Sequence, residues 1–194
     1  MQQSLLVISV LLLGGIGAIN SPAAHAQVAI SQTKGTIPSS PYQRSQQLQK
    51  LLQEGQNLMN AGNVSGAIAR YQQAAKLSPK NARIFATIGY LYARQRNFSA
   101  AINAYQQAIA AAPTHADFHY ALAYSLANLG QNAAAANAYR QTTTLDRNNV
   151  NAYLGLGIVL LRQKDYRGAE SATQQAPQTP NPKPQTPNPK PQTP

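Results

Sequence analysis

The sequence repeats itself every 34 residues, and this period restricts the fold more than any other property of the chain. The clearest copy spans 82–115, and the segments 48–81, 116–149 and 150–176 align with it at whole multiples of the period. Periods of this length are typical of arrays in which each repeat is a pair of helices. One pair cannot bury its apolar side alone, so neighbouring repeats must stack to form a continuous core. The period therefore predicts an all-α array of stacked helical hairpins.

The recurring residues stand at helical spacing within each copy. In 82–115, Phe85, Ile88 and Tyr92 occupy positions i, i+3 and i+7, which places them on one face of a first helix. A second stripe of small and aromatic residues follows after a short polar stretch. Small residues let two helices approach closely, and the larger ones fill the space between them. The members of the second stripe are Ala101, Tyr105 and Ala108.

Serine and proline mark the expected ends of the second helices. Ser65 and Ser99 stand at equivalent positions of the first two repeats, and we expect each to cap a second helix through its side-chain oxygen. Pro79 and Pro113 are expected to end the same helices, since proline cannot continue a helix. In the fourth repeat the second helix, expected at about 167–175, is short and polar, which suits the outer face of a terminal repeat. The sequence thus predicts three full hairpins and a shorter fourth.

These recurring positions resemble the tetratricopeptide repeat family, whose signature sets an aromatic residue, Leu-Gly, Tyr, Ala, a second aromatic residue and Pro at fixed spacings. The copy 82–115 matches best, and the others depart at a few positions, such as Glu54, His119 and Thr142. The resemblance implies an all-α fold, a right-handed α-solenoid of about 3.5 helix-turn-helix hairpins. It places the solenoid domain at 44–176, with disordered termini on either side.

The N-terminal residues 1–26 have the features of a secretory signal, an apolar run followed by the small-x-small cleavage site Ala24-His25-Ala26. The alternative is an uncleaved membrane anchor, although the apolar run is shorter than the ~20 residues that a membrane span needs. Residues 27–43 are polar and contain two prolines, so we expect a disordered lead-in. We expect an exported protein, located in the periplasm or another extracytoplasmic lumen, or secreted.

Residues 177–194 form a Pro-rich, low-complexity tail in which the segment QTPNPKP occurs twice. Proline at this density favours extended polyproline II. One interpretation is a solvated spacer. The other is a ligand for a proline-recognising partner, or for an anionic surface that Lys183 and Lys190 contact. The sequence leaves both open.

The chain carries 16 basic and 5 acidic residues, a formal net charge of +11. We expect a basic exported protein to meet acidic proteins, anionic lipid headgroups or wall polymers. Nucleic acid is disfavoured, because the basic residues are spread along the sequence and the signal exports the chain. The sequence contains no cysteine, which excludes disulfides, zinc fingers and thiol chemistry.

No pattern in the sequence indicates catalysis, since a Gly-rich phosphate loop, Gly-x-Ser-x-Gly and paired carboxylates are all missing. His115 and His119 are four residues apart, as in some metal sites, but no third ligand accompanies them. Two Asn-x-Ser sequences, at 63–65 and 97–99, match the glycosylation acceptor pattern, which turn and capping chemistry explains equally well. We therefore expect no enzyme activity, no cofactor and no metal.

In tetratricopeptide repeat proteins the first helix of each hairpin lines a concave groove that usually takes a peptide or a partner helix. Tyrosine suits such a surface because it offers a large apolar area with a polar tip, although each tyrosine here has the alternative of packing between hairpins. The family's chaperone-tail clamp of Lys, Asn and Arg is absent, because Leu52, Gln56 and Thr87 occupy its places. The positions that match the groove lining are Tyr90, Tyr120, Tyr124, Arg83, Arg94, Leu154, Ile158 and Arg162.

These features together predict an exported scaffold for protein–protein interaction. It would act as an adaptor or assembly factor that holds a partner peptide or helix in its groove. The alternative is a cell-envelope structural or tethering protein, which binds anionic surfaces through its basic surface and its Pro-rich tail. The adaptor needs the groove, whereas the tether needs the charge and the tail.

Overall fold

The computed structural model describes residues 40–177, and within this range it contains eight α-helices and no strand. None of these helices has the length and apolarity that a membrane crossing needs. The helices are α1 (Pro41–Asn60), α2 (Val64–Leu77), α3 (Ala82–Arg94), α4 (Phe98–Ala111), α5 (Ala116–Asn128), α6 (Asn132–Leu145), α7 (Val150–Arg162) and α8 (Tyr166–Gln174).

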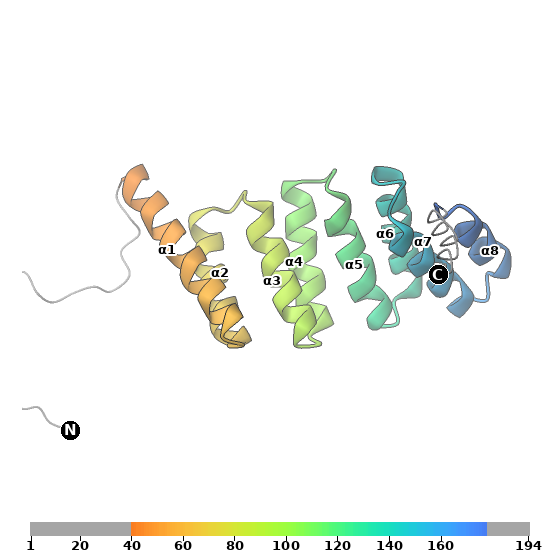
Figure 1. Ribbon diagram of the computed structural model, residues 1–194, viewed down its shortest axis with the longest axis horizontal. Coiled ribbons are helices and arrows are strands. Elements are labelled where there is room, and N and C mark those ends of the chain that lie inside the picture. Colours follow the sequence, from red (N-terminus) through yellow and green to blue (C-terminus); the bar gives the residue numbers. More distant parts are fainter. Residues whose placement is uncertain (1–39, 178–194) are drawn as a thin grey trace, which may run out of the picture. The chain divides into compact units, whose positions relative to one another are not determined.

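The helices pair in the order of the chain, so that each repeat is one hairpin. α1 packs on α2, α3 on α4, α5 on α6 and α7 on α8. Neighbouring hairpins join where α2 meets α3, α4 meets α5 and α6 meets α7, and the first helices also touch, α3 with α5 and α5 with α7. Figure 1 shows the hairpins lying side by side along the array. The predicted α-solenoid, with a shorter last hairpin, is confirmed.

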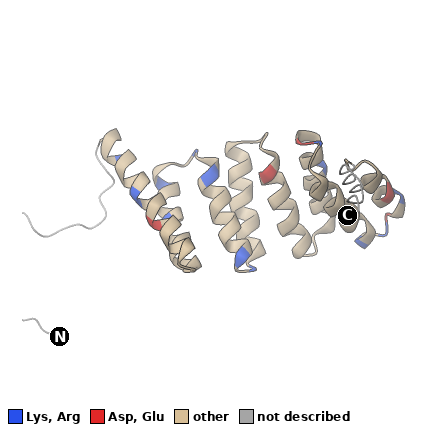
Figure 2. Cartoon of the chain, in the orientation of Figure 1, with Lys and Arg blue, Asp and Glu red and all other residues tan. Residues whose placement is uncertain are grey.

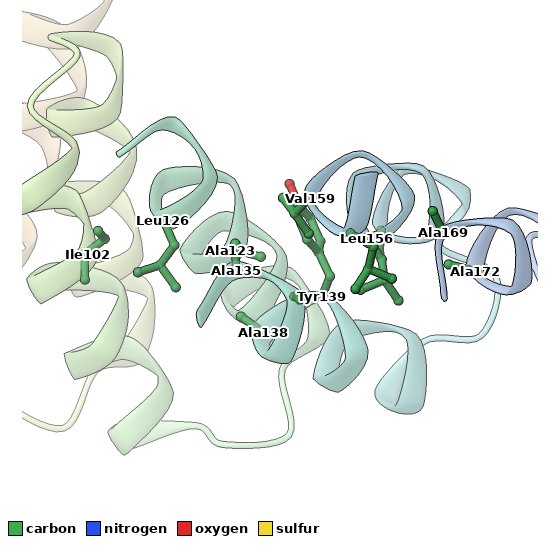
Figure 3. Close-up of a cluster of buried hydrophobic side chains, with 13 residues drawn as sticks. Ile102, Ala123, Leu126, Ala135, Ala138, Tyr139, Leu156, Val159, Ala169 and Ala172 are labelled. Atoms are coloured by element: carbon green, nitrogen blue, oxygen red, sulfur yellow. The ribbon is translucent and has the colours of Figure 1, made fainter. Parts of the chain in front are cut away.

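The buried residues form two clusters that meet at α4. One cluster runs from α1 to α4 and includes Leu51, Ile84 and Leu91. The other runs from α4 to α8, and Figure 3 shows its side chains, from Ile102 through Tyr139 to Ala172, between the packed helices. Since no hairpin has a core of its own, each repeat depends on its neighbours, as the period predicted.

Small residues bring the paired helices close enough for a tyrosine to fit between them. The ring of Tyr71 lies against Gly55, and a methyl group at Gly55 would stand 2.9 Å from it. The ring of Tyr105 lies against Gly89 in the same way, at 2.8 Å. These two tyrosines are 6% and 5% exposed. The recurring Gly and Tyr of the sequence are therefore packing partners.

The predicted caps at Ser65 and Ser99 are wrong. The N-caps of α2 and α4 are Asn63 and Asn97, whose side chains accept hydrogen bonds from the backbone N–H groups of Gly66 (2.9 Å) and Ala100 (3.2 Å). Asn caps at least as well as Ser, so the helix begins at the earlier residue and the serine falls inside the first turn. The same bonds account for the two Asn-x-Ser sequences. The ends before Pro79 and Pro113 agree with expectation, since α2 and α4 stop two residues earlier.

Helix α1 begins at Pro41, inside the stretch 27–43 that was expected to be disordered. Ser40 is the N-cap and forms a capping box with Gln43, with distances of 3.1 and 3.3 Å. Proline at the first helical position loses no hydrogen bond and has a suitable φ, so Pro41 favours the start of a helix here and not a disordered lead-in. The rest of the predicted lead-in, the predicted signal peptide 1–26 and nearly all of the tail 177–194 lie outside the described residues.

Candidate partner-binding groove

The first helices of the hairpins carry large apolar side chains that the core does not use. Tyr90 of α3 and Tyr124 of α5 are 51% and 49% exposed. On α7, Leu154, Ile158 and Leu161 are 46–52% exposed, at spacing i, i+4 and i+7. The opposite face of α7 is already apolar and buried in the core. This helix therefore has more apolar surface than its own packing requires.

A pocket of about 310 Å³ opens between α5 and α7. Tyr120 and Tyr124 line it from α5, Leu154 and Ile158 from α7, and Tyr139 reaches it from α6. The ring of Tyr139 lies against Gly155 of α7, where a Cβ atom would collide with it. Gly155 thus leaves room for the ring, and the pocket is formed by residues from two successive hairpins.

Burial raises the pKa of the Tyr139 hydroxyl to about 12, and the neighbouring Tyr120 and Tyr124 act in the same direction, while Arg162 opposes them. The rings of Tyr120 and Tyr139 meet edge to face, 5.9 Å apart. Tyr139 therefore stays neutral at physiological pH, and the pocket contains a hydroxyl rather than a phenolate.

Tyr124 and Arg162 are held in place at the edge of the pocket. The ring of Tyr124 meets Phe98 of α4 edge to face at 6.4 Å. The Nη1 atom of Arg162 donates a hydrogen bond to the carbonyl oxygen of Ala127 at 3.1 Å, which links the ends of α7 and α5. A guanidinium has five N–H groups, so most of those on Arg162 remain available to a ligand.

The structure places the predicted residues in two sets. Tyr120, Tyr124, Leu154, Ile158 and Arg162 line the pocket between α5 and α7. The other three belong to α3 and do not reach that pocket: the Arg94 guanidinium lies 5.9 Å from the centre of the Tyr90 ring, and Arg83 is exposed at the start of the helix. That either set binds a partner stays a prediction.

Each histidine of the His115 and His119 pair has a neighbour of its own. The His115 ring stacks on Phe118 with centroids 4.0 Å apart and lies 3.9 Å from the Asp117 carboxylate. The Nε2 atom of His119 is 2.8 Å from the carbonyl oxygen of Pro113. Within residues 40–177, no three His, Asp or Glu side chains come close enough to share a metal ion.

A second pocket, of about 640 Å³, was not anticipated from the sequence. It lies between α2 and α4, with α3 at its base, and amide side chains surround it. The only signal in the sequence is the Gln-Gln pair, which occurs at equivalent positions, 72–73 and 106–107. Its amide side chains are Gln72, Gln73, Asn103 and Gln107, and its aromatic side chains are Phe85 and Tyr92.

Charged residues are few, and many lie at helix ends and turns (Figure 2). In the described part of the chain only two acid–base contacts form, Arg70 with Glu54 at 3.1 Å and His115 with Asp117. Most of the basic side chains there are consequently unpaired. The groove positions of α3 and α7 include arginine and no acidic residue.

The sequence model of the tetratricopeptide repeat family matches residues 52–116, 86–139 and 120–182. No curated protein matches the chain. Among solved structures, the chain is similar to the crystal structure of MamA, with 24% identity and a TM-score of 0.63 over 66% of this chain and 75% of that one. A tetratricopeptide repeat protein from Parabacteroides merdae gives 18% identity and 0.63, over 67% and 52%.

The chain is also similar to the first TPR of Spaghetti (RPAP3) bound to the HSP90 peptide SRMEEVD. The identity is 20% and the TM-score 0.58, over 62% of this chain and 95% of that one. At these identities the likenesses show the shared fold and nothing more.

Proposed function

Since the chain belongs to the tetratricopeptide repeat family, we propose that it is an exported scaffold that holds a segment of a partner protein against the first helices of its hairpins. The observation that carries the proposal is the pocket between α5 and α7, where half-exposed aromatic and aliphatic side chains from two hairpins surround one space. An adaptor or assembly factor needs such a surface and needs no catalytic group.

The exposed side chains of the pocket would supply the binding energy. Burying a half-exposed tyrosine or isoleucine beneath a partner removes apolar area from water, and an aromatic residue at the centre of an interface contributes about 2 kcal/mol or more. The residues that hold Tyr124 and Arg162 reduce the conformational entropy that binding would remove. The RPAP3 structure supports the proposal in one respect, because there the same fold is bound to a peptide.

The test is recovery of partners by crosslinking from the native envelope, followed by mass spectrometry. Replacing Tyr124 and Ile158 together by alanine should abolish most of the recovery. The circular dichroism spectrum should stay unchanged and the melting temperature should fall by only a few degrees, because both side chains are half exposed. Tyr166→Ala on α8, where the ring is 66% exposed, is the matched control. Unchanged recovery of partners with the double variant would refute the proposal that this pocket binds them.

Export belongs to the same proposal and rests on residues 1–26 alone. If the segment is a cleaved signal, the mature protein begins at Gln27 and leaves the cytoplasm. N-terminal sequencing of the protein from fractionated cells tests this directly. A chain that retains Met1 and stays in the cytoplasmic fraction would contradict it.

The tethering alternative rests on the net charge of +11 and on the Pro-rich tail. A chain that ends at Ala176 separates the two functions. The scaffold should keep its partner without the tail, whereas a tether should lose its retention in the envelope.

A further inference from the structure

The turn inside every hairpin passes through one residue with a left-handed backbone. These residues are Gly62 (φ 76°), Arg96 (φ 58°), Gly130 (φ 76°) and Lys164 (φ 64°), spaced one period apart. In each turn the N–H of this residue donates to the carbonyl oxygen three residues earlier, at 2.9–3.2 Å. The four turns therefore have the same backbone, but two contain glycine and two contain a basic residue.

The fold by itself favours glycine at this position. A side chain crowds the backbone when φ is positive, and glycine is the usual residue just beyond a helix C-terminus for that reason. Hairpins one and three follow this rule. Arg96 and Lys164 are exposed, and within the described part of the chain neither side chain makes a hydrogen bond or an ion pair. Backbone strain that packing does not require suggests a function for the side chain.

The same alternation appears two residues earlier, at the C-terminal end of each first helix. Asn60 and Asn128 occupy the position in hairpins one and three, and Arg94 and Arg162 occupy it in hairpins two and four. A cation near a helix C-terminus interacts favourably with the helix dipole. All four first helices have that dipole, so the dipole does not explain why only two of them carry a pair of basic residues.

The two arginines also belong to the groove. Arg94 lies over the ring of Tyr90, and Arg162 is bonded to the carbonyl oxygen of Ala127. Between them, the turn of hairpin three is uncharged and exposes Leu129. α3 touches α5 and α5 touches α7, and packed helices lie 8–10 Å apart, so the two basic pairs are roughly 20 Å apart.

We propose that the pairs Arg94/Arg96 and Arg162/Lys164 bind two acidic clusters on one partner segment, whose apolar side chains enter the pocket between α5 and α7. This inference rests on the proposed function and names the chemistry of the partner. Charge complementarity supports it, since every charged groove position of α3 and α7 is an arginine. The acidic residue of α5, Asp117, lies in the first turn of that helix, at the end opposite the two basic pairs. The chain's own tail is a poor occupant, because its only charged residues, Lys183 and Lys190, are basic.

The distance between the two basic pairs sets the spacing of the acidic clusters in the partner. Acidic clusters separated by roughly 20 Å stand about 13 residues apart in a helix and about 6 residues apart in an extended chain. This arrangement differs from the chaperone-tail clamp, because it uses the turn edge of the array and not the clamp positions, which Leu52, Gln56 and Thr87 occupy.

The test uses two synthetic peptides, one helical and one extended, with paired glutamates at these spacings and leucines between them. For each, a matched peptide has glutamine in place of glutamate. Binding to the full chain is measured by fluorescence polarisation at low ionic strength. Arg96→Gly with Lys164→Gly removes two cations and gives both turns the glycine that hairpins one and three already have.

We expect this double variant to bind the better glutamate peptide about tenfold more weakly and to bind the glutamine peptide as the parent does. Its melting temperature should be unchanged or slightly higher, because glycine relieves the strain of a positive φ. The control is Lys80→Gly with Arg147→Gly, which removes the same charge from the turns between hairpins and should leave binding unchanged.

Three results would overturn the inference. The first is an equal loss of affinity for the glutamate peptide in the control variant, which would show that the effect depends only on net charge. The second is equal affinity of glutamate and glutamine peptides for the parent, or no binding of either. The third is binding of inorganic polyphosphate or anionic vesicles, but not of the peptides, with the same dependence on Arg96 and Lys164. A fourth result would separate this inference from the proposed function: if binding falls in the Tyr124→Ala, Ile158→Ala variant but not in the Arg96→Gly, Lys164→Gly variant, the basic pairs are refuted and the groove still stands.

Discussion

The N-terminal and C-terminal pairs of hairpins share one repeat frame but use it differently. In hairpins one and two, Tyr71 and Tyr105 fit against glycines of their own first helices, Gly55 and Gly89. In hairpin three the equivalent of those glycines is alanine, and the ring of Tyr139 lies against Gly155 of the next hairpin.

The same contrast appears in the groove and at the caps. Beside α1 the groove positions are mainly amides, whereas α7 presents leucine and isoleucine. Among the second helices, α2, α4 and α8 have caps with a side-chain bond, from Asn63, Asn97 and Asp165, whereas Gln131 caps α6 without one. The buried tyrosine thus recurs in hairpins one to three with a different glycine partner in the third, which keeps the helices packed, whereas the exposed groove positions differ in residue type and therefore in what they can bind.

The largest expected effect contrasts two leucines on first helices of opposite halves. Leu91 of α3 is completely buried, so Leu91→Ala should lower the free energy of unfolding by about 3 kcal/mol. Leu161 of α7 is 52% exposed, and Leu161→Ala should change it by less than about 0.5 kcal/mol. Urea unfolding followed by circular dichroism measures both. Similar losses would show that the face of α7 is part of the core.

The second prediction concerns alkaline pH and compares Tyr105 with Tyr139. Burial raises both pKa values to about 12, from the ordinary 10, with Tyr90 adding to the effect on Tyr105. The neutral form is favoured in the folded state, so this stability is complete below pH 10 and is lost as the pH rises towards 12. The loss should be roughly 2–3 kcal/mol for each tyrosine.

Unfolding titrations between pH 9 and 12 measure that loss. Tyr105→Phe and Tyr139→Phe should each make the decline shallower, and Tyr42→Phe, at an exposed site, should not. A flat profile in the parent protein would contradict the burial of both hydroxyl groups.

The third prediction tests the glycine that receives the tyrosine. Gly89→Ala should destabilise the protein by about 1–2 kcal/mol, because overpacking against the Tyr105 ring outweighs the better helix propensity of alanine. Ala123→Gly, at the equivalent position of hairpin three, should destabilise by about 1–2 kcal/mol, through lost helix propensity and the loss of a buried methyl group. Thermal unfolding of both variants and of the parent protein measures these changes in stability. If Gly89→Ala is stabilising, the Tyr105 ring can accommodate a methyl group at position 89, and the close contact between them is not a constraint.

The smallest expected loss of stability compares an N-cap whose side chain makes a hydrogen bond with an N-cap whose side chain makes none. Asn97→Ala removes the hydrogen bond to the Ala100 N–H and should cost about 1 kcal/mol. Gln131→Ala should cost less than about 0.5 kcal/mol, because that side chain makes no capping bond. Ser99→Ala serves as a further control, and a larger loss there than at Asn97 would restore serine as the cap.

Much of the array and of the groove lining was predictable from the sequence. The period and the recurring small and aromatic residues predicted eight helices in four hairpins, because helical spacing and close packing are local requirements on residue type. The resemblance also supplied groove positions, and five of them, Tyr120, Tyr124, Leu154, Ile158 and Arg162, do share one pocket. Whether they bind a partner is still a prediction.

Other features depended on distances between residues far apart in the chain, which a pattern along the sequence does not contain. Tyr139 reaches the pocket only because Gly155, on the next hairpin, leaves room for it. Arg162 is oriented by the carbonyl oxygen of Ala127, 35 residues earlier. The left-handed backbone of Arg96 and Lys164 likewise became visible only in the folded turns. The order of residues along the chain specifies which positions repeat and hence the fold. Which of these side chains touch follows only from the folded array, because their contacts depend on how neighbouring hairpins pack.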